Sequence, residues 1–128
     1  MAPPGRSYGE VGEFFAPDWR SGPVLRALTF GERWRGLRPQ PHSGGLWLAG
    51  RSVHGFGMKE SLWICGLDGG EVVIAVRQLQ PARLATIPRA KSVLELSLHL
   101  HPPDVGMALT WLGARDVDSL RDADRQPG

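Results

Sequence analysis

The stretch "SVLELSLHLH", residues 92–101, carries the clearest pattern in the chain. Four leucines alternate with four polar residues: Leu94, Leu96, Leu98 and Leu100 against Glu95, Ser97, His99 and His101. Side chains of a strand point to opposite faces in turn, so strict alternation indicates a strand with one buried face. We therefore expect a half-buried strand over all ten residues, with the leucines facing the core.

Short apolar runs between glycines and prolines extend this pattern along the chain, which has 17 Gly and 11 Pro. "DGG" at 68–70 separates two such runs and predicts a hairpin. "GERWRGLRPQP" (31–41) predicts one short helix that the prolines end. Further strands are expected at 23–30, 44–50, 61–68, 71–79 and 107–113. The expected fold is mainly β, a small jelly-roll-like sandwich or partly closed barrel with one short helix.

The length of 128 residues fits one domain. Residues 1–22 hold many breakers and little periodicity, so we expect a loosely ordered N-terminal arm from which Phe14, Phe15 and Trp19 tuck onto the domain surface. The single β domain is expected over 23–113. The mixed charges of 114–128 predict a flexible C-terminal tail.

Charge and cysteine usage narrow the classes of protein that fit. The formal net charge is only +2, and the cations are spread singly along the chain, which argues against a nucleic-acid binder. The lone cysteine, Cys65, sits in "LWICGL", where a buried small side chain is expected, and it excludes a disulfide within the chain. No apolar run is long enough to span a membrane. We expect a cytoplasmic protein.

The segments "ERWRGLR", "GGLWL", "RSVHGFGMKESLWICGLDGGEVV" and "VLEL" occur in an order that resembles the uncharacterised bacterial and archaeal family called domain of unknown function 192. The resemblance covers about residues 25–110 and implies a compact, mainly β fold, but no reaction. Two departures stand out. Trp63 occupies a position where the family commonly has aspartate, and "SLH" replaces a tight turn after "VLEL".

The loop "SVHGFGMK" (52–59) is the first candidate site. His54 is either a base or metal ligand at a strand mouth, or a ring that bonds backbone groups and pins the loop. Arg35, in the expected helix, is either part of an anion clamp or an exposed residue on a solvated face. With Phe56 and Lys59, these residues would line a groove for a peptide or a small anionic ligand.

The pair "HLH" is the second candidate site. His99 and His101, two positions apart on a strand, would lie about 6.6 Å apart along it and could share a zinc or iron ion with Glu95. The polar face of an exposed strand explains the same pair.

We therefore expect a non-enzymatic binding or accessory module with no catalytic residues and no cofactor. The alternatives are an enzyme dependent on a divalent metal held by the His/His/Glu strand face, and a weak nucleic-acid binder.

Overall fold

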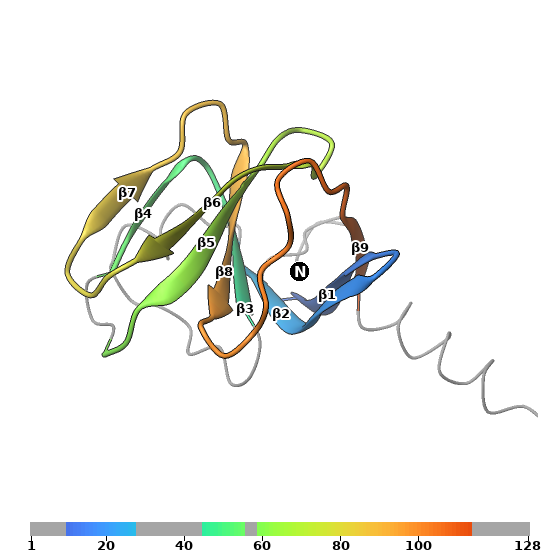
Figure 1. Ribbon diagram of the computed structural model, residues 1–128, viewed down its shortest axis with the longest axis horizontal. Coiled ribbons are helices and arrows are strands. Elements are labelled where there is room, and N and C mark those ends of the chain that lie inside the picture. Colours follow the sequence, from blue (N-terminus) through green and yellow to red (C-terminus); the bar gives the residue numbers. More distant parts are fainter. Residues whose placement is uncertain (1–9, 28–44, 56–58, 114–128) are drawn as a thin grey trace, which may run out of the picture.

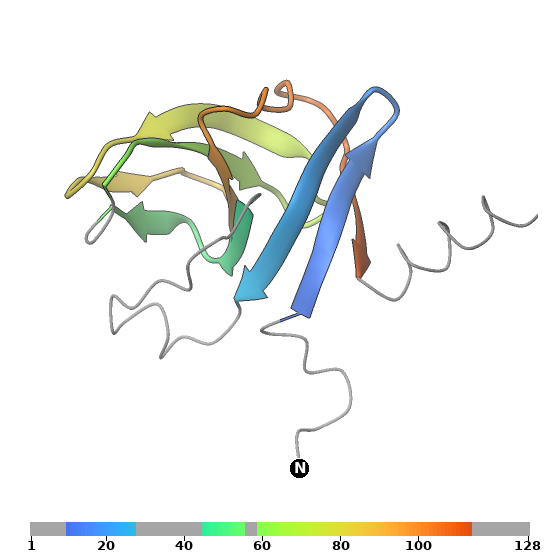
Figure 2. The ribbon, with the colours of Figure 1, turned by 90° about the horizontal axis from the view of Figure 1, so that it is seen from below.

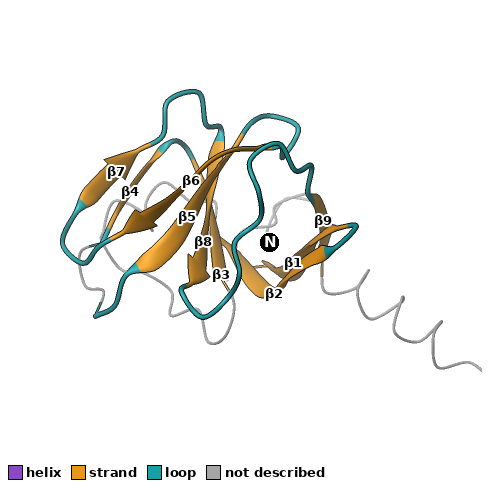
Figure 3. Cartoon of the chain, in the orientation of Figure 1, coloured by secondary structure: helices purple, strands orange, loops and turns teal. Residues whose placement is uncertain are grey.

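The computed structural model describes residues 10–27, 45–55 and 59–113, and this part consists of strands and loops (Figure 3). The strands are β1 (Glu10–Ala16), β2 (Trp19–Ala27), β3 (Gly45–Ala49), β4 (Ser52–His54), β5 (Leu62–Leu67), β6 (Val73–Leu79), β7 (Leu84–Thr86), β8 (Ser92–Ser97) and β9 (Thr110–Gly113). In these ranges no helix has the length and apolar character needed to cross a membrane.

Seven strands form one sheet in the order β6-β5-β8-β3-β2-β1-β9, and β4 pairs with β7 in a separate two-stranded ribbon (Figure 1). All pairings are antiparallel except that of β2 with β3. Backbone bonds join the segment before β9 to the start of β6, from Val73 N–H to Met107 O at 2.9 Å and from Gly106 N–H to Val73 O at 2.7 Å. The described strands do not close into a barrel. The predicted mainly β, sandwich-like fold is confirmed.

Each face of the sheet carries a core, because its strands are covered on both sides. The first core lies between the β1–β2–β9 end, which stands at an angle to β5 and β6 in Figure 2, and the rest of the sheet. Within it, Phe14, Trp47 and Trp111 form a cluster of rings with centroids 4.7–5.0 Å apart. The second core lies under the β4–β7 ribbon: Leu46, Leu48, Val53, Ile64, Leu79, Ile87, Ala90 and Val93.

The two cores explain why β8 differs from its prediction. Leu94 and Leu96 face the first core as expected. Glu95 points to the opposite face of the sheet, but it is only 1% exposed because that face is covered as well. The strand also ends at Ser97, whose carbonyl accepts a bond from Leu100 N–H at 3.0 Å in a turn. Leu98 is therefore 39% exposed, and the predicted ten-residue strand is wrong beyond residue 97.

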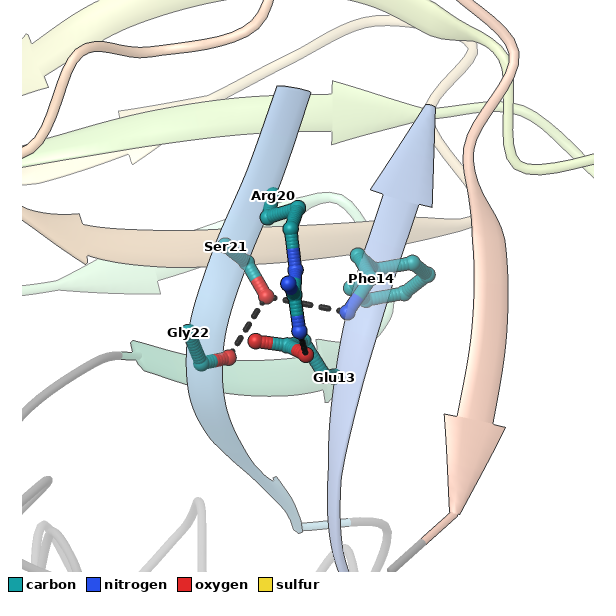
Figure 4. A network of polar contacts seen from close by, with 5 residues as sticks. All are labelled: Glu13, Phe14, Arg20, Ser21 and Gly22. Carbon is teal, nitrogen blue, oxygen red and sulfur yellow. Dashed lines mark hydrogen bonds and ion pairs between the residues drawn. The ribbon is translucent and has the colours of Figure 1, made fainter. Parts of the chain in front are cut away.

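The expectation of a loose arm is wrong for residues 10–22, which form β1 and the first part of β2. Phe14 does not tuck onto the surface but is fully buried in the first core. A bulge at residues 13–15 interrupts the β1–β2 ladder. Ser21 Oγ accepts a bond from Phe14 N–H at 2.9 Å and donates to Gly22 O at 2.7 Å (Figure 4). The expected helix (31–41) and tail (114–128) lie outside the described residues.

Candidate functional site

The structure places two of the four predicted ligand-binding residues. His54 is half-buried at the end of β4, and Lys59 is exposed. Arg35 and Phe56 lie outside the described residues, so the predicted groove stays a prediction.

The predicted metal set is not brought together. Glu95 is buried in β8, paired with Leu46 and Ile64 of the second core. His99 and His101 are exposed and follow the end of that strand. Across the described ranges, no group of three or more His, Cys, Asp or Glu side chains could hold a metal ion. The alternation on which the "HLH" metal site rested stops at Ser97, so the described part of the chain gives that site no support.

Cys65 is a fully buried thiol in β5. Burial raises its pKa to about 12, because desolvation disfavours the thiolate. The thiolate is the nucleophilic form of cysteine, so at neutral pH this side chain stays a protonated thiol that contributes to core packing.

The β4–β7 ribbon is the most distinctive surface element. Its inward side chains, Val53 and Ala85, pack on the second core. Because side chains alternate along a strand, its outward ones are Ser52, His54, Leu84 and Thr86. On this side the Ser52 and Thr86 hydroxyl oxygens are 2.9 Å apart, and Leu84 is 70% exposed.

Cations surround this ribbon at both ends and along one side. At one end, Ile87 N–H bonds to Arg51 O at 2.8 Å, and Gly50 N–H bonds to Lys91 O at 2.8 Å. At the other end, Gly55 N–H bonds to Arg83 O at 2.7 Å. Along the side, Arg77 of β6 donates to Thr86 O at 3.3 Å. The exposed surface of the ribbon and its flanking segments is named here the basic ribbon face, and it carries five exposed cations: Arg51, Arg77, Arg83, Arg89 and Lys91.

These cations have few acidic residues near them in the sequence and no acidic partner among the described residues. Residues 45–55 and 72–94 contain no acidic residue, and Glu95, which follows the second range, is buried. None of the five forms an ion pair with a described residue. Arg20, on β2, contrasts with them because its guanidinium lies 2.8 Å from Glu13 (Figure 4). Exposed like charges with no ion pair to a described residue raise the local positive potential, which favours anions near this face.

Sequence reasoning missed this face because its cations lie far apart along the chain. The pairing of two three-residue strands brings Arg51 next to residues 83–91, and strands that short have no readable periodicity. The available signal was the four cations and no acid of residues 72–94.

Comparisons of the chain with protein-family models, with curated proteins and with solved structures gave no match. The resemblance to the family called domain of unknown function 192 stays a prediction.

Proposed function

We propose that the chain is a non-enzymatic binding module that holds an anionic partner on the basic ribbon face. The observation that carries this proposal is the set of five exposed cations, without ion pairs to described residues, around one ribbon. Four of the five are arginines, whose planar guanidinium forks suit phosphate and carboxylate groups.

The ribbon also gives these cations a fixed scaffold. Its inward side is anchored in the second core by Val53, which is 4% exposed, and Ile87, which is 1% exposed. A rigid scaffold lowers the entropy that binding must offset. Arg51 precedes β4, and Arg83 bonds to Gly55, which follows β4. The two ends of the ribbon are therefore separated by the four-residue step from Arg51 to Gly55, or roughly 14 Å of backbone. This separation favours an extended anion over a single small ion.

Thermal unfolding with inorganic tripolyphosphate tests the proposal. A ligand that binds only the folded state, at a hundredfold excess over its Kd, stabilises it by about 2.7 kcal/mol. We expect tripolyphosphate to raise the Tm at low salt, and the rise to disappear at high salt.

Paired variants separate this face from general charge. Arg51→Gln/Arg83→Gln should lose most of the Tm rise, while Arg20→Gln, on the β1–β2 side of the molecule, should keep it (Figures 1 and 2). No rise in the unchanged chain, or an equal rise in the ribbon variant, would contradict the proposal.

A further inference from the structure

We propose that Arg26 of β2 and the side chains around it form a second binding site, for the carboxylate group of a small organic anion. This site is separate from the basic ribbon face and does not rest on it. It consists of four residues of the sheet, which we call the Arg26 cluster: Glu10, Arg26, Trp47 and Trp111.

The register of the sheet gathers this cluster on one face. Arg26 lies directly opposite Trp47 of β3 and Glu10 of β1. Directly opposed residues of paired strands project to the same side, and Trp47 belongs to the first core. The guanidinium carbon of Arg26 accordingly lies 4.3 Å from the centroid of the Trp47 ring. Trp47 is buried and Arg26 is half-buried, so the cluster lies where the first core meets the solvent.

The charge of Arg26 is not neutralised within the described part of the chain. Its ladder partner Glu10 instead accepts a hydrogen bond from Trp111 Nε1 at 3.0 Å. No ion pair joins Arg26 to a described carboxylate. A half-buried cation has lost part of its hydration, and a counter-ion interacts with it more strongly than with a cation in bulk water. Arg26 therefore favours a bound anion.

Two buried N–H donors of the cluster also lack an acceptor. Nε of Arg26 and Nε1 of Trp47 are both buried, and neither bonds to a described residue. Native structures pair the large majority of buried polar side-chain atoms, because an unpaired donor carries the full cost of its desolvation. The two Nη atoms of Arg26 are not among these buried atoms. An anion can therefore approach from the solvent and bond to Nη and Nε together.

These features select a carboxylate with a single charge. The two oxygens of a carboxylate match two adjacent N–H groups of a guanidinium in a bidentate pair. Glu10, on the same face, repels a phosphate dianion about twice as strongly as it repels a carboxylate. The half-buried Trp111 ring, whose centroid lies 5.0 Å from that of Trp47, adds apolar surface to the cluster. An aromatic carboxylate suits both properties.

Titration of the ¹⁵N-labelled full chain with benzoate tests this inference, because each of the five tryptophans gives its own indole N–H signal. We expect a saturable shift of the Trp47 signal. Trp63 Nε1 provides the matched control and should not move: it is also buried without a bond to a described residue, but β5 lies three strands from β2. Benzamide, which keeps the ring and lacks the charge, should shift neither signal.

Substitutions of the arginines show which cation holds the ligand. Arg26→Gln should weaken benzoate binding by about 10- to 100-fold, the range expected for loss of a charged hydrogen-bonding partner. Arg26→Lys keeps the charge without the planar fork, so its affinity should fall between the two. Arg20→Gln and Arg51→Gln/Arg83→Gln should bind benzoate like the unchanged chain. Circular dichroism of each variant checks that it is folded, and Arg26→Lys serves alone if Arg26→Gln is not.

The outcomes bear on this site separately from the basic ribbon face, which is tested with tripolyphosphate on other residues. No saturable shift of the Trp47 signal, or an equal shift with benzamide, would overturn the site. Benzoate binding that Arg26→Gln and Arg26→Lys leave unchanged would also overturn it. Inorganic phosphate that binds more tightly than benzoate would overturn the choice of a singly charged carboxylate.

Discussion

Gly66 of β5 lies against Ile87, the residue that follows β7, so Gly66→Ala tests how tightly this end of the ribbon packs on the sheet. A Cβ on Gly66 would lie 2.6 Å from Cγ2, 3.1 Å from Cδ1 and 3.3 Å from Cβ of Ile87. Real carbon atoms do not approach to 2.6 Å, so the ribbon end or the strand must shift. Overpacking of this kind costs about 1–3 kcal/mol. We expect that loss in the free energy of unfolding, measured by urea denaturation with an unchanged m-value.

Two backgrounds identify the clashing atom. Ile87→Val removes Cδ1 but keeps Cγ2, so Gly66→Ala should cost as much there as in the unchanged chain. Ile87→Ala removes both atoms and leaves only Cβ at 3.3 Å, so Gly66→Ala should cost little in that background. The coupling energy from this double-mutant cycle isolates the contact. A neutral Gly66→Ala, or an equal cost in the Ile87→Ala background, would refute the reasoning.

Three further predictions concern the rest of the fold. Phe14→Ala should destabilise the chain by about 3–5 kcal/mol in urea denaturation, because it empties the centre of the first core; a loss below 1 kcal/mol would contradict that placement. Asp68→Ala should cost about 1–2 kcal/mol, since its carboxylate accepts from Gly70 N–H at 2.8 Å and Val72 N–H at 3.0 Å; Asp68→Asn, which keeps an acceptor oxygen, should recover part of that loss. For Cys65, a pKa raised from 9.0 to about 12 means that the folded state keeps its proton while the unfolded state loses it. Its contribution is complete below pH 9 and falls by about 1.4 kcal/mol per pH unit as the pH rises toward 12. The stability difference between the unchanged chain and Cys65→Ala should follow that slope, and a difference independent of pH would exclude it.

The central strands could be predicted from sequence because each is a short apolar run between breakers. The runs at 44–50, 61–68 and 71–79 became β3, β5 and β6, and "DGG" joined the last two as a hairpin. β1 could not be found in this way. "EVGEFFA" has no clear alternation, because Gly12 lies against the Trp111 ring and a bulge at residues 13–15 breaks the period.

The sequence pattern also failed to indicate that both faces of the sheet are covered, and this was the larger error of the prediction. Alternation over residues 92–97 indicates a strand with one buried face, yet Val93 and Glu95 are as buried as the leucines. The cover on that side comes from β4 and β7, each only three residues long. The same pairing assembles the basic ribbon face, so one undetected element accounts for both the second core and the site.

The measurement that tests the central claim most directly is a titration of the ¹⁵N-labelled chain with inorganic tripolyphosphate at low salt, followed residue by residue in amide spectra. The account predicts shifts concentrated at residues 50–55 and 82–91, with β1, β2 and β9 unmoved. Shifts centred on β1 and β2, or spread evenly over the surface, would show that the ribbon cations are an ordinary solvated face.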